Sequence, residues 1–373
     1  MRKDNTKLQK VVNIINTLIF TLFIGTMITM FVVTPDEKIS ISEKRNLAQV
    51  PVLNLEEIET KKFMDNLENY TLDQFPYRDT FRKIKTYFEL DFMGKSDSSG
   101  YTTDNGHVHK VDYELHSQNI EKTLGKIMKV AAEINESGDK DIYISIIPDK
   151  SYYNDKIQTL DYNDAFKIIY QNIDGLKYID ITGELMERDY YYTDLHWKQE
   201  NIVKIANKLL TELGKSEISK DNYTEKAVTD KFNGSYGSAS AFSISKDTIT
   251  ILTNDKLDSI KVFDYETNKY MDVYTLSKAE GIDPYDTYLG GAKSLLRMEN
   301  PNSLSDEKLI IFRDSFTSSL APLLVDEYSE ILLVDLRYIN YNYLSKIIDL
   351  KQYDDALFLY NIIVLNESES FKF

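Results

Sequence analysis

The chain contains no cysteine among its 373 residues. This absence excludes structural disulfides, thiolate nucleophiles and cysteine-based zinc or iron–sulfur sites. It does not define the compartment, because an exported protein can dispense with disulfides. Any covalent catalysis must therefore use serine, threonine or a carboxylate as its nucleophile.

Positive charge is also scarce. The 44 Lys and Arg residues face 60 Asp and Glu residues, and the formal net charge is -16 at pH 7. An acidic surface repels phosphate backbones, so nucleic acid is not an expected partner, and a strongly anionic polymer is less favourable as a substrate. Walker and Gly-x-Gly-x-x-Gly motifs are missing, so nothing indicates nucleotide binding and no cofactor is expected.

Long hydrophobic runs are absent except for one near the N-terminus, at residues 11–33. This run is long enough to span a bilayer as a helix. Basic residues exceed acidic ones ahead of it, which places residues 1–10 in the cytoplasm and the rest of the chain outside the cell. A cleaved signal peptide is the alternative, but its apolar region is usually shorter, and no Ala-x-Ala site follows. We expect a single-pass membrane anchor.

After the anchor, residues 34–110 read as an extracytoplasmic, largely helical lead-in. Helical spacing covers Leu55–Tyr70 and Phe81–Phe92, and the polar stretch Ser96–His109 predicts turns and a hairpin. Residues 111–373 then alternate between strand and helix patterns, which indicates a three-layer α/β domain with a mainly parallel sheet. Within this domain, residues of about 215–300 predict a small antiparallel insertion.

The predicted elements of the α/β domain follow one another in a regular order. Apolar strand patterns and helical spacings separate clearly in most of them. The expected strands are Ile142–Ile147, Tyr178–Ile181, Leu309–Phe312, Ile331–Val334, Leu357–Tyr360 and Ile362–Leu365, and the expected helices are Ile120–Ile134, Ala165–Ile173, Ile202–Leu213, Thr317–Leu324 and Tyr343–Leu350.

The stretch Tyr190–Glu200 concentrates unusual residues. It holds Trp197, the only Trp of the chain, and His196, one of four His. Asp194 lies two positions before His196, and such positions point to the same side of an extended backbone. A carboxylate that orients an imidazole makes it a general base. The alternative is a helix N-cap formed by Thr193 or Asp194.

A candidate nucleophile lies far downstream. Ser315 follows an apolar strand and precedes a predicted helix. At that place, backbone N–H groups and the helix dipole can stabilise a developing oxyanion. The surrounding residues do not form the Gly-x-Ser-x-Gly elbow. The alternative is that Ser315 or Asp314 only caps the helix.

Taken together, Asp194-x-His196-Trp197 and the strand ending in Asp314-Ser315-Phe316 resemble a known family. The match is to the SGNH-hydrolase-like acetyltransferases typified by the alginate O-acetylation proteins, and most closely to the DHHW family. Further elements resemble the family in the same order: Ser42–Pro51, Asp73–Asp79, Ile147–Lys150 with Tyr152 or Tyr153, Tyr288–Gly291 and Leu333–Tyr338.

The resemblance implies that Ser315 is the nucleophile, His196 the base and Asp194 its orienting acid. Leu195 replaces the first His of the family's name, a position that is not the base. Arg313 stands where the family often has Gly. The separate Gly and Asn oxyanion blocks have no clean match, and Gly290 and Gly291 are the nearest candidates.

Other residues are weaker candidates. Arg337, in Asp335-x-Arg337, either holds substrate or forms an internal salt bridge. Tyr192, with Tyr190 and Tyr191, either stacks on sugar rings or belongs to the core, and Trp197 is a wall of the site or a core plug. His107-Val-His109 has the spacing of a metal pair, but an exposed hairpin is the preferred interpretation, and no metal site is expected.

The expected function is therefore a membrane-anchored extracytoplasmic O-acetyltransferase. The resemblance implies an exopolysaccharide or cell-wall glycan as acceptor and a multi-pass membrane acyltransferase as the partner that supplies acetyl groups. A polysaccharide acetyl esterase with the same triad is one alternative. A non-catalytic scaffold or glycan-binding subunit of the acetylation machinery is the other.

Overall fold

A computed structural model describes residues 2–111, 114–136, 140–367 and 371–372. Contacts between Cα atoms divide the chain into two units, Met1–Met93 and Gly94–Phe373. The hairpin that ends at Lys110 falls in the second unit, whereas the sequence assigned it to the lead-in.

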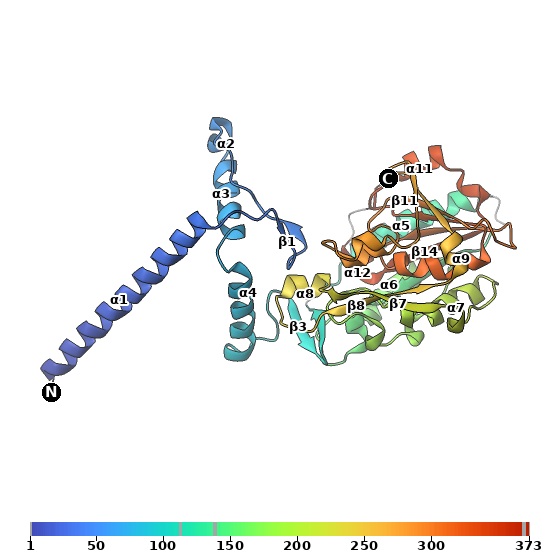
Figure 1. Ribbon diagram of the computed structural model, residues 1–373. Coiled ribbons are helices and arrows are strands. Elements are labelled where there is room, and N and C mark those ends of the chain that lie inside the picture. The colour runs from blue at the N-terminus through green and yellow to red at the C-terminus, as the bar shows by residue number, and fades with distance from the viewer. Residues whose placement is uncertain (1, 112–113, 137–139, 368–370, 373) are drawn as a thin grey trace. The chain divides into compact units, whose positions relative to one another are not determined.

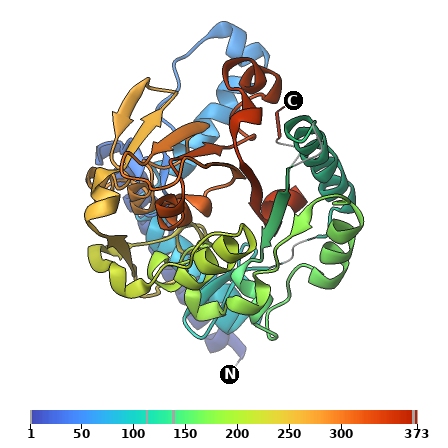
Figure 2. The same cartoon turned by 90° about the vertical axis from the view of Figure 1, so that its right-hand side faces the viewer.

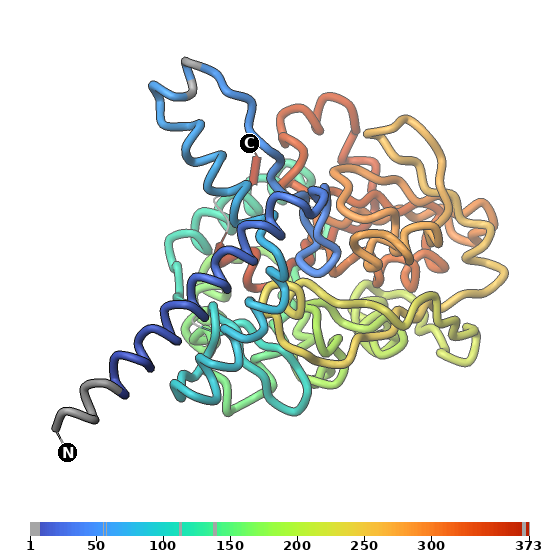
Figure 3. Tube along the Cα trace, turned by 60° about the vertical axis from the view of Figure 1, so that its left-hand side comes forward, coloured from blue at the N-terminus to red at the C-terminus, as the bar shows by residue number. Residues whose placement is uncertain are grey.

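The first unit begins with the long helix α1 (Arg2–Val33). Its apolar stretch Leu8–Val33 is long enough to cross a membrane, and most of the side chains in this stretch are exposed. The chain then passes through a small hairpin into shorter helices, as the blue tube of Figure 3 shows. These elements are β1 (Ile39–Ser40), β2 (Arg45–Asn46), α2 (Leu55–Glu59), α3 (Lys62–Asp73), α4 (Arg78–Tyr87) and a π-helical turn (Phe88–Phe92).

The helix predicted over Leu55–Tyr70 is in fact two helices. Lys61 adopts a left-handed conformation with φ of 62° and separates α2 from α3. Within this unit, Arg45 binds the Asp73 carboxylate through both of its terminal nitrogens, at 2.8 and 2.5 Å. This bidentate pair fastens the β1–β2 hairpin to the end of α3.

The second unit is built on an eight-stranded sheet with the order β10-β9-β11-β13-β12-β14-β5-β6. The strands from β13 to β6 are parallel, while β10, β9 and β11 join antiparallel at the other edge. Their bounds are β5 (Ile142–Ile147), β6 (Lys177–Tyr178), β9 (Lys261–Asp264), β10 (Lys269–Met271), β11 (Leu295–Glu299), β12 (Lys308–Arg313), β13 (Glu330–Val334) and β14 (Asp355–Asn361).

Helices cover both faces of the sheet (Figures 1 and 2). Alternate residues of each central strand enter two separate hydrophobic cores, because successive strand side chains point to opposite faces. One face packs against α5 (Ser117–Ile134), α6 (Tyr162–Gln171), α11 (Tyr341–Ile347) and α12 (Ile362–Glu367), and the other against α7 (Val203–Glu212) and α10 (Thr317–Leu320).

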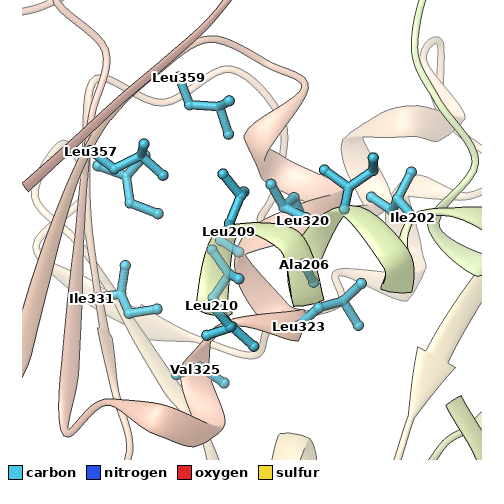
Figure 4. Packing of buried hydrophobic residues seen from close by; sticks show 14 of the residues in the cluster. Ile202, Ala206, Leu209, Leu210, Leu320, Leu323, Val325, Ile331, Leu357 and Leu359 are labelled. Carbon is cyan, nitrogen blue, oxygen red and sulfur yellow. The ribbon is translucent and has the colours of Figure 1, made fainter. Parts of the chain in front are cut away.

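The core around α7 shows how the apolar spacing is used. Ala206, Leu209 and Leu210 of this helix are fully buried. They pack among side chains of the sheet and of the segment after the candidate nucleophile (Figure 4), with Leu320, Leu323, Val325, Ile331, Leu357 and Leu359 labelled. The segment that follows Ser315 therefore packs on a continuous hydrophobic core.

The expected α/β fold with a mainly parallel sheet is confirmed, with two corrections. The segment Ile362–Leu365, predicted as a strand, is helix α12; a short apolar run does not by itself distinguish the two. The second correction concerns the insertion predicted at about residues 215–300, because only part of it is separate from the main sheet. Strands β7 (Thr224–Phe232) and β8 (Asp247–Thr253) form their own ladder, but β9, β10 and β11 extend the main sheet. The remaining short elements are β3 (Tyr101–Asp104), β4 (His107–Lys110), α8 (Ser235–Ser240) and α9 (Asp255–Ser259).

Candidate active site

The candidate nucleophile lies at the carboxyl end of β12, which has parallel neighbours on both sides. The chain turns at Asp314 and Ser315 and enters α10. The Asp314 carboxylate accepts the Phe316 N–H at 3.0 Å and the Asn361 N–H of the neighbouring strand β14 at 2.6 Å. Burial raises the pKa of Asp314. Ser315 keeps partial exposure at the top of this turn.

Arg313 occupies the position where the family often has Gly, and its side chain is buried beneath the turn. Its guanidinium donates to the Ser318 Oγ at 2.9 Å and to the carbonyls of Asp314 and Lys293, each at 3.3 Å. Burial lowers the pKa of Arg313, and the nearby Asp335 carboxylate opposes that shift. Arg313 therefore braces the turn from inside and does not obstruct Ser315.

His196 and Asp194 lie opposite this turn. The His196 Nε2 is 2.7 Å from the Ser315 Oγ, and its Nδ1 is 2.5 Å from the Asp194 Oδ1. This is the order of contacts that lets a carboxylate fix the imidazole tautomer while the other nitrogen takes the hydroxyl proton. Helix α7 begins only after Ile202 and has no side-chain cap, so the helix-cap interpretation of Asp194 is wrong.

The second oxygen of Asp194 is also satisfied. Its Oδ2 accepts the Ser235 N–H at 2.6 Å and the Ser235 hydroxyl at 2.9 Å, both from the start of α8. A Cβ on the preceding Gly234 would overlap the Asp194 side chain, so this close approach of two backbones requires glycine. Ser235 thus binds the Asp194 oxygen that does not face the His196 Nδ1.

Tyr285 packs flat against the imidazole. The ring centroids of Tyr285 and His196 are 3.9 Å apart with an interplanar angle of 10°. The Tyr285 hydroxyl donates to the Ser315 carbonyl at 3.3 Å and shares a hydrogen bond of 3.0 Å with the Ser319 Oγ. One buried side chain therefore contacts both members of the Ser–His pair.

Residues 164–334 match the family model described as DHHW protein. The matched segment contains both the Asp194–Trp197 stretch and Ser315. The resemblance predicted from the motifs is confirmed.

Solved structures agree with this fold. PatB1 from Bacillus cereus is similar with a TM-score of 0.60 at 16% identity, covering 73% of this chain and 100% of its own. A DHHW family protein from Eubacterium siraeum is similar with a TM-score of 0.58 at 16% identity, covering 74% and 94%. No curated protein sequence matches this chain significantly.

Two of the other predicted site residues have structural roles. Trp197 is fully buried, and its Nε1 donates to the Phe316 carbonyl at 3.1 Å and to the Ser319 Oγ at 3.0 Å. Trp197 is therefore a core residue and not an exposed wall of the site, and its hydrogen bonds support the segment that follows Ser315. Arg337 forms a bidentate ion pair with Asp335, at 2.9 and 2.6 Å, which is the internal salt bridge that was the alternative to substrate binding.

In the described part of the chain, Tyr192 and the two glycines form no hydrogen bond with Ser315. Tyr192 is 42% exposed and its ring packs on His107, with centroids 4.4 Å apart. The Gly291 N–H donates to the Tyr288 carbonyl at 3.2 Å, so this donor is used within its own turn. A side chain on Gly290 would face Met271. The N–H of Ser315 itself has no acceptor among the described residues, which leaves it as an oxyanion donor.

The sequence predicted an exposed hairpin at His107 and His109, and this prediction is wrong. Both side chains are buried, and burial lowers the pKa of each to about 3, so both imidazoles are neutral. Among the described residues, no cluster of three His, Cys, Asp or Glu side chains has a geometry suited to a metal ion.

Three functional neighbours were not identified from the sequence: Ser235, Tyr285 and Asp247. They lie 41, 91 and 53 positions after Asp194 in the printed chain, on turns or short elements without a motif. Only the fold brings them beside the Asp–His pair. The Asn-Gly-Ser sequence before α8 was a signal for a close backbone turn, but it does not indicate what that turn contacts.

Proposed function

We propose that this protein is a membrane-anchored extracytoplasmic O-acetyltransferase that modifies an exopolysaccharide or cell-wall glycan. The observation that carries the proposal is the unbroken hydrogen-bond chain from Asp194 through His196 to a partly exposed Ser315. A serine hydroxyl is a weak nucleophile unless a base removes its proton, and this arrangement supplies the base.

In the proposed first step, the Ser315 Oγ attacks the carbonyl carbon of an acetyl ester. His196 takes the hydroxyl proton, and the Ser315 N–H stabilises the oxyanion. Collapse breaks the ester bond, and the leaving alkoxide takes the proton back from His196. In the second step a glycan hydroxyl gives its proton to His196 and attacks the acetyl-serine, which regenerates free Ser315 and releases the acetylated sugar.

A structurally similar protein supports the proposal that this fold can carry an activated nucleophile. The solved PatB1 structure carries a sulfonyl adduct, and sulfonyl reagents react with activated nucleophiles. We expect Ser315 to be modified by the same class of reagent. The apolar stretch Leu8–Val33 supports a membrane anchor, and the excess of basic residues before it supports a cytoplasmic N-terminus. A multi-pass acyltransferase is the proposed source of acetyl groups.

The decisive experiment measures acetyl transfer by the full chain in detergent. A chromogenic aryl acetate serves as donor and neutral oligosaccharides as acceptors, and mass spectrometry follows both the acetylated sugar and free acetate. We expect acetylated sugar and an acetyl group on Ser315 at short times. Acetate release without any acetylated sugar would favour the esterase alternative.

The matched variants are Ser315→Ala and Ser345→Ala, which changes an exposed serine on α11. Ser315→Ala should abolish turnover and covalent labelling, while Ser345→Ala should leave both unchanged. If polymer acetylation in cells is the same with Ser315→Ala as with the unaltered chain, the protein is a scaffold and the proposed chemistry is wrong.

A further inference from the structure

Lys150 is a fully buried lysine at the start of the short 3-10 turn Lys150–Tyr153, which follows β5. Its Nζ donates to three main-chain carbonyls of the catalytic loop, those of Tyr191, Tyr192 and Asp194, at 3.0, 3.1 and 2.9 Å. An ammonium group has three hydrogens, so these contacts use all of them. Nothing in the acid–base chemistry of the triad requires this lysine.

The three carbonyls converge on the Lys150 nitrogen. The carbonyls of adjacent residues alternate in an extended chain, so those of Tyr191 and Tyr192 could not both face one group there. Carbonyl oxygens gathered around one point repel one another unless a cation lies between them. Lys150 supplies that cation, and its ammonium also lies 5.2 Å from the centre of the Tyr236 ring.

The opposite side of the loop meets a buried anion. Asp247, at the start of β8, accepts the N–H groups of Tyr192 and Thr193 at 2.9 and 2.8 Å, and the Thr193 hydroxyl at 2.7 Å. The loop thus presents carbonyls to a buried cation and N–H groups to a buried anion. Asp247 is bonded to the two residues before Asp194, and Lys150 is also bonded to the carbonyl of Asp194 itself.

We propose that Lys150 and Asp247 are positioning residues that hold this loop so that Asp194 stays directed at its imidazole. Among the described residues neither is hydrogen-bonded to Ser315, and both bind the main chain of the loop. This inference rests on the proposed function for its kinetic readout. Its structural readout, the hydrogen bond between Asp194 and His196, does not depend on the reaction.

Protonation of Lys150 gives the inference a pH signature. Burial lowers its pKa to about 8, and nearby carboxylates oppose that shift. The charged and titratable groups that face it are Asp149, Asp194, Asp247 and Glu187, together with the neutral His107 and His109. Above this pKa the amine keeps only two hydrogens and turns a lone pair toward the carbonyls. The loop then loses one bond, and activity should fall.

Stability should respond with the opposite sign. The folded pKa of Lys150, about 8, is below the usual value of 10.5, so the unfolded chain binds more protons between these values. The contribution of this lysine to the free energy of unfolding therefore rises with pH in that window. A loss of activity that accompanies constant or rising stability cannot come from unfolding.

The test uses the full chain with Lys150→Met, Asp247→Asn and the double variant. Methionine keeps an unbranched, flexible side chain that ends one atom short of the lysine nitrogen, and it has no hydrogen-bond donor. The matched control is Lys156→Met, an exposed lysine that pairs with Asp104. We expect Lys150→Met to lower kcat on the order of a hundredfold, with KM within about twofold, because a small misplacement of a catalytic group is enough. We expect the double variant to lose less than the product of the two single losses.

Proton NMR of the imidazole hydrogens gives the second readout. The His196 Nδ1 proton should resonate far downfield in the unaltered chain and in Lys156→Met, and should be lost in Lys150→Met. The pH–rate profile of the unaltered chain should fall above the Lys150 pKa of about 8, and this fall should be absent in Lys150→Met.

The outcomes separate the two proposals. If the unaltered chain shows no turnover and no labelling, but the downfield proton is present and depends on Lys150, then the proposed function fails and the positioning role holds. If Lys150→Met folds and keeps its kcat and the downfield proton, the positioning role is wrong. Should that variant not fold, a pH–rate profile of the unaltered chain with no fall near the Lys150 pKa overturns the inference.

Discussion

The two segments that form the candidate site are held in different ways. The nucleophile turn continues directly from β12, whose register is set by parallel strands on both sides. The stretch from Tyr190 to Trp197 contains only one isolated bridge between its own ends. Its hydrogen-bond partners include Lys150, Asp247 and Ser235, which come from three distant parts of the chain.

This difference shows how each segment positions its side chains at the candidate site. A residue at a strand end takes its position from the hydrogen bonds of the sheet, so it needs little additional support. An irregular loop has no such ladder, and its buried polar groups must find partners elsewhere. Buried charges suit that task only when they are fully bonded, as Lys150 and Asp247 are. We therefore expect changes around the histidine loop to reduce activity more than changes beneath the nucleophile turn.

The largest effect should come from Asp194→Asn. The amide keeps the shape of the side chain but cannot stabilise the imidazolium, and it favours the wrong tautomer of His196. By analogy with serine hydrolases, kcat should fall on the order of ten-thousandfold. Steady-state kinetics with an acetyl ester measure it, and Asp230→Asn, on the exposed surface of β7, is the control. A loss of less than tenfold would mean that Asp194 does not orient the base.

Gly234→Ala should cause the second-largest loss of kcat. The added methyl group would overlap Asp194, so the loop and α8 must move apart. We expect a loss of kcat on the order of a hundredfold, together with about 1–3 kcal/mol of the free energy of unfolding. Chemical denaturation and kinetics measure both. Gly125→Ala is the matched control, because Gly125 is exposed in α5 with open space around it, and alanine should stabilise that helix by up to about 1 kcal/mol.

Arg313→Met tests the other side of the comparison. It removes the donors from two buried acceptors and one part-buried acceptor, which should cost about 1–3 kcal/mol of the free energy of unfolding. Since β12 still positions Ser315, kcat should fall by no more than about tenfold. If this variant instead loses as much activity as Gly234→Ala while it remains folded, the sheet does not position the nucleophile as we infer.

Tyr285→Phe should have the smallest effect. It removes the hydroxyl bonds to Ser315 and Ser319 but keeps the stack on His196. We expect kcat to fall roughly two- to fivefold, in line with the loss of one modest hydrogen bond. Tyr285→Leu also removes the stack and should lower kcat further, by roughly three- to tenfold beyond Phe. Equal activities of the two variants would show that the stack does not assist His196.

The sequence predicted the α/β fold well where apolar periodicity was strong. Strand β5 has the predicted bounds, and α7 and β12 lie within a residue or two of theirs. Short apolar runs were ambiguous, so Ile362–Leu365 was assigned as a strand although it is helical. The burial of His107 could not be predicted, because the pattern of one hairpin does not reveal what covers it.

By itself, the sequence determined the anchor-length apolar run and most of the strand–helix order, because these depend on local spacing and composition. Its motifs, together with the family resemblance, also pointed to Asp194, His196 and Ser315 as a candidate triad, although 119 positions separate His196 from Ser315. Only the tertiary structure decided that Tyr285 lies on the imidazole, that Ser235 binds Asp194, and that the loop lies between a buried cation and a buried anion. These contacts join residues far apart in sequence, and they form only because the sheet and its helices bring the ends of separate elements to one place.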